Sequence, residues 1–373
     1  MRIVTVVILH AAALHTAWAQ APAVVEVRGT TGCKGCSIEL RRVARLGNAS
    51  DPILVVQGPR IARDSRGFFY LAPTSEPGTL AIYDAGGRFV RSMGKAGLGP
   101  NEFQSIRNLM IGPADTLFVF EGGAARMTRL SPGGKIISRA RIPGVPNLGG
   151  VALLRDGRVA LALTLRTRQR IGLPIHVIER TGAVIMSFGA DPATVVLPGE
   201  SDSRLRSIAI GNGNSIWSAP VNRYEIERWT PNGLQRQTVR RIVDWFQPWK
   251  TRRAGRPDEV RPSPRLLGVT EDPSGRLWTL VQTAAGDWKQ TGQPPADARM
   301  ESNRPVLSHD ARQRYFETVI EVIDSSTGRL LASRRLPGII AGFYQGNLIT
   351  RVNEDADGFL YTDVWELRFI ARQ

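Results

Sequence analysis

Short apolar segments separated by tight turns run along most of this chain. The recurrent unit is an apolar strand, a turn rich in Asp, Gly, Asn or Pro, and a second strand that carries aromatic residues. Turn residues with a positive or preset φ join such strands into hairpins. The pattern predicts six β-hairpins and an all-β fold. These hairpins span residues 61–70, 109–119, 153–160, 208–217, 269–278 and 352–361.

A second hairpin follows most of these units, at residues 80–90, 127–137, 177–185, 226–234 and 322–330. Two hairpins make one four-stranded antiparallel blade, and blades repeated around a ring make a β-propeller. The sixth blade ends on a third strand at 365–370, whereas residues 38–47 match the outer strands in pattern. An N-terminal strand that completes the last blade leaves no open sheet edge. We therefore predict a six-bladed β-propeller over residues 38–373, preceded by an N-terminal segment at 20–37.

The first 19 residues have the pattern of a secretory signal peptide. Arg2 precedes an apolar run at 3–14, and Ala17-Trp18-Ala19 forms an A-x-A cleavage site. The run is shorter than the roughly 20 residues that a bilayer requires, which favours export and cleavage over a retained membrane anchor. No later stretch is apolar enough to span a membrane. We expect a monomer in the periplasm or outside the cell.

The formal net charge of +16 changes this picture only in part. Arginine accounts for nearly all of the cations and is scattered along the chain, which indicates compositional bias rather than one binding stripe. An exported protein rarely meets nucleic acid, so we expect no nucleic-acid partner. Such a field still attracts anionic polymers or membrane surfaces.

The two cysteines are Cys33 and Cys36, in a C-x-x-C spacing followed by Ser37. A local disulfide is the default in an oxidising compartment. Ser37 stands where a c-type haem motif requires His, and further zinc ligands are not evident. A redox-active dithiol is the alternative, because C-x-x-C spacing can lower a thiol pKa.

The first link between predicted blades reads G-K-A-G-L-G-P-N-E-F at residues 94–103. This stretch, together with the strand-turn-strand repeat, resembles the NHL-repeat family of six-bladed propellers. The other blades keep only the turn and strand pattern. The resemblance implies the fold and a role outside the cytoplasm, because one fold supports many functions.

Candidate binding residues fall in loops that one face of the propeller should carry. Two long insertions, 243–264 and 283–314, lie in such loops, and long loops are often functional. Arginine beside tryptophan suits recognition of carboxylate, phosphate or sulfate, and both are common interface anchors. We predict a non-catalytic binding face for a protein, an anionic glycan or a small molecule; the alternative is that the aromatic residues only cap the core. The candidates are Arg166, Arg168, Arg170, Arg223, Trp245, Trp249, Arg252, Arg253 and Trp288.

The NHL resemblance also implies a competing function. Some NHL-like propellers are calcium-dependent lactonases or esterases, in which Asp, Glu and Asn side chains converge on the central channel. Oxygen ligands of this kind are what calcium requires. On that alternative the metal ligands are Glu121, Asn222, Asp244 and Asp363, and calcium is the possible cofactor. No G-x-S-x-G nucleophile motif is present, and the residues assign no catalytic side chain.

Overall fold

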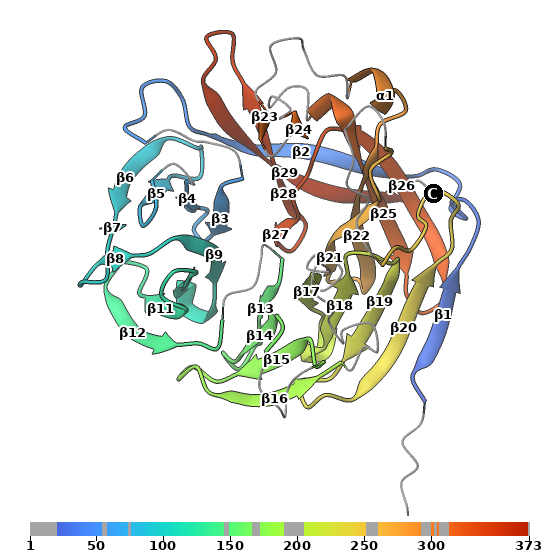
Figure 1. Ribbon diagram of the computed structural model, residues 1–373, viewed down its shortest axis with the longest axis horizontal. Helices are drawn as coiled ribbons and strands as arrows, with labels where there is room; N and C mark the ends of the chain where they lie inside the picture. Colours follow the sequence, from blue (N-terminus) through green and yellow to red (C-terminus); the bar gives the residue numbers. More distant parts are fainter. Residues whose placement is uncertain are drawn as a thin grey trace, which may run out of the picture.

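Six β-sheets stand side by side around a central channel (Figure 1). Each contains four antiparallel strands, and the first strand of each blade lines the channel. The predicted six-bladed β-propeller is therefore confirmed. The computed structural model describes residues 21–53, 58–73, 76–144, 149–165, 172–189, 205–250, 260–291, 300–301, 304–305 and 313–371.

Blades I to III follow one another along the chain. Blade I consists of β3 (Arg60–Arg63), β4 (Phe69–Ala72), β5 (Leu80–Tyr83) and β6 (Phe89–Met93). Blade II consists of β9 (Ile106–Ile111), β10 (Leu117–Glu121), β11 (Arg126–Leu130) and β12 (Ile136–Arg141). Blade III consists of β13 (Val151–Leu153), β14 (Val159–Ala162), β15 (Ile175–Ile178) and β16 (Val184–Phe188).

Blades IV to VI complete the ring. Blade IV consists of β17 (Arg206–Ile210), β18 (Ile216–Pro220), β19 (Glu225–Trp229) and β20 (Gln235–Arg241). Blade V consists of β21 (Arg265–Glu271), β22 (Arg276–Ala284), β25 (Phe316–Asp324) and β26 (Arg329–Pro337). Blade VI consists of β27 (Phe343–Gln345), β28 (Leu348–Glu354), β29 (Leu360–Ala371) and β2 (Cys36–Leu46).

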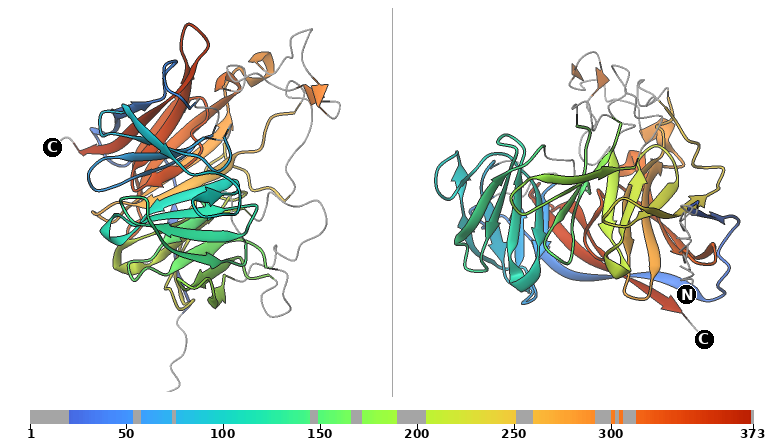
Figure 2. Two further views of the ribbon diagram at one scale, coloured as in Figure 1. Left: turned by 90° about the vertical axis from the view of Figure 1, so that its left-hand side faces the viewer. Right: turned by 90° about the horizontal axis from the view of Figure 1, so that it is seen from below.

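Short elements decorate the connections between these strands. The described residues include the 3-10 turns η1 (Pro113–Asp115) and η4 (Asn212–Asn214) and the helix α1 (Trp288–Thr291). They also include two two-stranded pairs, β7 (Lys95–Ala96) with β8 (Glu102–Phe103) and β23 (Met300–Glu301) with β24 (Arg304–Pro305). Figure 2 shows α1, β23 and β24 standing out from one face of the ring. No helix of the described residues is long and apolar enough to cross a membrane.

The two ends of the chain meet in blade VI. β2 pairs antiparallel with β29, with Cys36 opposite Ala371 and Leu46 opposite Thr362, so the predicted closing strand is confirmed. The predicted order within this blade was wrong. The 352–361 hairpin joins the second and third strands, β28 and β29, and β27 is the first strand. Residues 365–370 continue without a turn from Leu360, so β29 is one strand of 12 residues.

The N-terminal segment before β2 contacts two further blades. β1 (Ala23–Val27) adds a fifth, parallel strand to the outer edge of blade IV, which the sequence analysis did not predict. Gly32 then donates to the carbonyl of Leu330 in blade V at 2.9 Å. Cys33 and Cys36 form the predicted disulfide, with Cα atoms 5.5 Å apart. The segment therefore links blades IV, V and VI.

The hydrophobic core is divided among the interfaces between neighbouring blades. Each of six clusters of the described residues fills one interface, for example Trp217 and Val281 between blades IV and V. Because inner strands are covered on both faces, all five residues of β10 are buried. Most residues of the outer strand β6 are exposed. Burial on both faces explains why the second strands read as nearly continuous apolar runs.

Candidate binding face

The antiparallel order of the blades gives the ring two different faces. Connections from strand 1 to strand 2 and from strand 3 to strand 4 lie on one side, which we call the turn face. Connections from strand 2 to strand 3 and from blade to blade lie on the other, which we call the link face. Both predicted insertions, 243–264 and 283–314, belong to the link face by this topology. Residues 251–259, 292–299, 302–303 and 306–312 of these insertions are outside the described part of the chain.

An aromatic cluster covers the link face between blades IV and V. The rings of Tyr224, Trp245 and Phe246 lie within 5.3–6.2 Å of one another, centroid to centroid. Phe246 is buried in the interface core, whereas Trp245 is only partly covered. Phe246 therefore anchors the connection, and Trp245 is the most exposed ring of the cluster. Trp245 also packs on the same core.

Trp249 is held by hydrogen bonds to its own connection. Its indole N–H donates to the carbonyl of Pro264 at 2.7 Å, and its backbone N–H donates to the carbonyl of Asn222 at 3.1 Å. The Asn222 side-chain amide donates in return to the Trp249 carbonyl at 2.7 Å. This predicted binding residue thus also orders the link between blades IV and V.

Cations lie over two of the predicted tryptophans. The Arg335 guanidinium sits 5.4 Å from the Trp245 ring centroid, and the Lys289 ammonium sits 5.7 Å from the Trp288 ring centroid. Trp288 also contacts Tyr315, with ring centroids 6.5 Å apart, and Tyr315 contacts Phe316 at 4.7 Å. The side chain of Arg335 is 46% exposed and pairs with Glu317, the residue after Phe316. A tryptophan and a cation therefore lie together at two places beside blade V, Trp245 with Arg335 and Trp288 with Lys289.

A buried ion pair contacts Tyr224 of this aromatic cluster. Arg241 donates to both carboxylate oxygens of Glu321, at 3.0 and 3.1 Å, and both side chains are less than 5% exposed. Tyr224 donates to the same carboxylate at 2.8 Å and contacts the hydroxyl of Thr279 at 2.6 Å. Burial raises the pKa of Tyr224 well above its usual value, and the Glu321 charge raises it further. The phenol therefore stays protonated and donates.

Only one of the predicted binding arginines is among the described residues. Arg223 lies just before β19 and donates to Glu225 at 3.1 Å. Its positive charge is therefore partly balanced within its own blade. The remaining predicted arginines are outside the described residues: Arg166, Arg168, Arg170, Arg252 and Arg253.

The four residues of the calcium alternative lie in different surroundings. Glu121 is fully buried and accepts from Arg126, Thr128 and the Gln104 backbone. Asp363 accepts from Arg45 at 3.1 Å and from Asn353 at 3.0 Å. Asp244 is exposed.

None of these four, Asn222 included, is among the residues that line the channel cavity. Within the described residues, no three His, Cys, Asp or Glu side chains gather to hold a metal ion. The calcium alternative stays a prediction.

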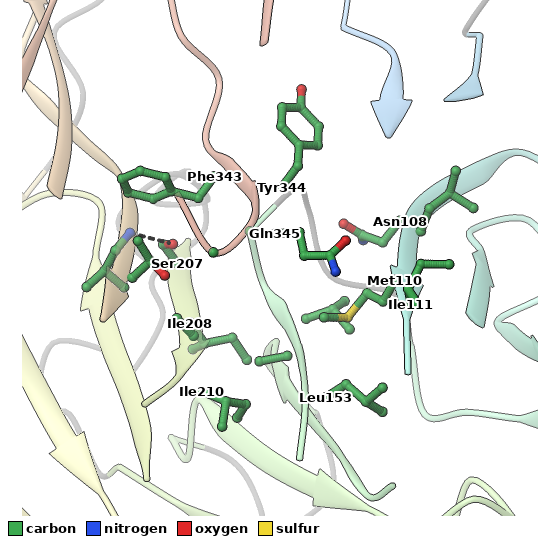
Figure 3. A pocket seen from close by; sticks show the side chains of 18 of the residues that line it. Asn108, Met110, Ile111, Leu153, Ser207, Ile208, Ile210, Phe343, Tyr344 and Gln345 are labelled. Carbon is green, nitrogen blue, oxygen red and sulfur yellow. Dashed lines mark hydrogen bonds between the residues drawn. The ribbon is translucent and has the colours of Figure 1, made fainter. Parts of the chain in front are cut away.

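The channel itself contains a cavity of about 230 Å³ (Figure 3). All six inner strands contribute to its wall. Most of the lining is apolar, and Figure 3 shows Met110, Leu153 and Ile210 around it. The polar lining residues include Arg60, Asn108, Ser207 and Gln345.

Sequence reasoning missed the two arginines that matter most to these two regions. Arg335 lies in the outer strand β26, and Arg60 opens the inner strand β3. Neither lies in an insertion, so loop length gave no signal for them. Once the blades were counted, both could have been identified as arginines near the link-face ends of their strands.

Comparison with solved structures finds the same fold in exported and uncharacterised proteins. A protein from Bacteroides fragilis described as exported aligns with a TM-score of 0.58 at 9% identity, covering 93% of this chain and 100% of that one. A member of the DUF4221 family from Bacteroides vulgatus aligns with a TM-score of 0.61 at 10% identity, covering 90% and 100%. The likeness shows the fold alone.

No model of a known protein family matches the chain, and no curated protein matches it. The resemblance of the first blade link to NHL repeats therefore stays a prediction. In the structure, Glu102 of this link accepts from the Gly99 backbone at 2.7 Å and from Lys95 at 3.2 Å. Arg139 of blade II donates to the Gly99 carbonyl at 3.1 Å. These contacts give the motif a structural role between blades I and II.

Proposed function

We propose that this protein is an exported, non-catalytic binding propeller that holds an anionic glycan on its link face, over blades IV and V. The observation that carries the proposal is the Arg335 guanidinium over the partly covered ring of Trp245. A sulfate or carboxylate can pair with the edge of such a guanidinium while a sugar ring packs beside the indole. Export is supported by the N-terminal pattern and by the Cys33–Cys36 disulfide.

The ion pair between Arg335 and Glu317 is weak enough to leave Arg335 able to bind another anion. Glu317 is its carboxylate partner, and the Arg335 side chain is 46% exposed. Exposed pairs of this kind contribute only about 0–1 kcal/mol, so an incoming anion can replace Glu317. Lys289 over Trp288 offers a second cation on the same blade.

Charge in the link-face connections supports the same ligand class. The connection from β14 to β15 carries Arg166, Arg168 and Arg170 and no acidic residue between positions 163 and 174. A glycan chain that spans several blades would meet cations from more than one connection. Binding of that kind weakens steeply as salt rises, because surface charges are screened.

The test uses dextran sulfate as the probe and the mature chain without its leader. Affinity is measured by calorimetry at low salt for the wild type, Arg335→Ala, Lys289→Ala and Trp245→Phe. We expect Arg335→Ala to lose about threefold to tenfold in affinity, since a charge-assisted contact is removed.

Arg88→Ala is the matched control, because Arg88 is also an exposed arginine paired with a carboxylate, Asp84, on the turn face. We expect this variant to keep wild-type affinity. Equal losses in Arg88→Ala and Arg335→Ala would show that only overall charge attracts the polymer, and the proposal would then fail.

A further inference from the structure

The central channel carries a cation, Arg60, that pairs with no carboxylate among the described residues. Glu271 lines the same cavity and accepts from the Asn212 backbone and the Trp217 indole. Arg60 lines the cavity at the start of β3, where the chain enters blade I from the link face. Its Nε donates to the carbonyl of Arg107 at 2.7 Å, and one terminal nitrogen donates to the carbonyl of Gly58. Among the described residues, neither Arg60 nor the neighbouring Arg107 pairs with an acidic side chain.

These contacts fix the guanidinium but do not use all of it. Arginine has five N–H donors, and the two carbonyls accept from two of them. The rest of the planar group matches the two oxygens of a carboxylate or the oxygens of a phosphate or sulfate. Burial lowers the pKa of Arg60; Tyr344 partly offsets this, and Arg107 lowers the pKa further. An anion at this position would relieve both effects.

The remainder of the cavity is suited to an apolar group. In β9 and β17 the polar residues Asn108 and Ser207 come before the apolar residues Ile111 and Ile210. Because the inner strands run from the link face to the turn face, Ile111 and Ile210 lie at the end of the channel away from Arg60, which we call the apolar end. Glu271 and Gln345, at the ends of β21 and β27, also line the wall there. Leu153 of β13 adds to the apolar end (Figure 3).

We propose that the channel binds one small organic anion, with its acidic head on Arg60 and its apolar body among the side chains deeper in the channel. The volume of about 230 Å³ lies near the small end of ligand pockets, which fits a molecule of one ring or one short branched chain. Pockets with mostly apolar walls and a few convergent polar groups are typical ligand sites. This inference is independent of glycan binding at Arg335, because the two sites share no residue.

Calorimetry with a defined set of probes tests the site. Phenylacetate, benzoate, 4-methylvalerate and phenyl sulfate supply an acidic head and an apolar body. Acetate lacks the body, and phenylacetamide lacks the charge. We expect one site per chain for at least one of the four amphipathic anions, with Kd on the order of 0.1–1 mM. Acetate and phenylacetamide should bind at least about tenfold more weakly, since a hydrogen bond to a charged group or the apolar contact is lost.

Variants connect the binding to the named residues. Arg60→Met should abolish binding of the anion. Arg60→Lys should weaken binding about tenfold, because lysine lacks the planar guanidinium that binds two oxygens at once. Leu153→Phe should reduce binding, because the larger side chain fills the apolar end. Arg63→Met is the control, because Arg63 ends the same strand but does not line the cavity. If Arg60→Met does not fold, Arg60→Lys and Leu153→Phe give the same answer.

Two results would overturn the proposal. One is that none of the four amphipathic anions binds the wild type; the other is that binding persists unchanged in the Arg60 and Leu153 variants. Dextran sulfate affinity, measured in parallel, should stay within about twofold of wild type in Arg60→Met, since Arg60 is in the inner strand of blade I, Arg335 is in the outer strand of blade V, and blade VI lies between them. Failure of the channel site and failure of the link-face site can therefore be told apart.

Discussion

The turn face and the link face of this propeller use arginine differently. On the turn face, Arg66, Arg88, Arg158 and Arg276 each pair with an aspartate two or four residues earlier in the chain. On the link face, Arg335 lies over a tryptophan and Arg60 lines a cavity without a carboxylate partner among the described residues. Arginine stabilises turns on one face. On the other, Arg126 and Arg223 pair with glutamates, whereas Arg335 and Arg60 lie beside aromatic or apolar surface.

This difference explains why net charge alone says little about function. A large positive total includes arginines that are already neutralised within their own turns. Asp272, for example, accepts from the backbone of Ser274 and Arg276 and from the Arg276 side chain. The cations that can recognise an anion are those beside aromatic or apolar surface without a strong local partner. Arg335 and Arg60 are such cations on the link face and at its opening into the channel.

The largest effect should come from the buried ion pair beneath the link face. Glu321→Ala leaves Arg241 charged and buried and removes the acceptor of Tyr224. We expect a loss of about 3–5 kcal/mol in the free energy of unfolding, measured by urea denaturation. Glu317→Ala removes the partly buried partner of the exposed Arg335 and should cost about 1 kcal/mol. Similar losses in both variants would show that the exposed pair is as structural as the buried one.

The next effect concerns the turn face. Asp272→Ala removes two backbone hydrogen bonds, the pair with Arg276 and the acceptor of the Trp278 indole. We expect a loss of about 1–3 kcal/mol in unfolding free energy with no change in dextran sulfate affinity. Weaker binding in a variant of unchanged fold would contradict the separation of the two faces.

A smaller effect should appear as a pH dependence of stability. Hydrogen bonds from the Arg158 side chain lower the pKa of Asp156 below its usual value. A pKa lowered by folding contributes stability that is present above the unfolded pKa and lost as pH falls through the folded pKa. Asp156→Asn should therefore lose stability at neutral pH and differ less from wild type near pH 3. Urea denaturation at both pH values measures this, and an equal difference at both would contradict it.

The smallest effect should be that of Arg60→Met on the protein without ligand. This variant loses two hydrogen bonds to carbonyls, which destabilises the fold. It also removes a half-buried charge without a carboxylate partner, which stabilises the fold because the desolvation cost is gone. We expect the melting temperature to change by less than about 1.5 °C, which corresponds to about 1 kcal/mol for a chain of about 350 residues. A large loss would show that Arg60 is mainly a structural residue of blade I.

The repeated turns made the architecture predictable, whereas the contacts between distant residues did not follow from the sequence. Six hairpins and the closing strand β2 could be identified because apolar strands alternate with turn residues that fix φ. The parallel strand β1 could not, since its pairing with β20 joins positions more than 200 residues apart. Trp245 and Trp288 were predicted from their loops. Their cations, Arg335 and Lys289, became evident only when the strands were placed in space.

Hydrogen exchange of the mature protein with and without dextran sulfate tests most directly whether binding is confined to the link face. With dextran sulfate bound, we predict slower exchange in peptides from 243–250, 285–291 and 313–318. Exchange in the turn-face peptides around Asp84 and Asp272 should be unchanged. Slower exchange at the turn-face peptides, equal to or greater than that at the link face, would contradict it.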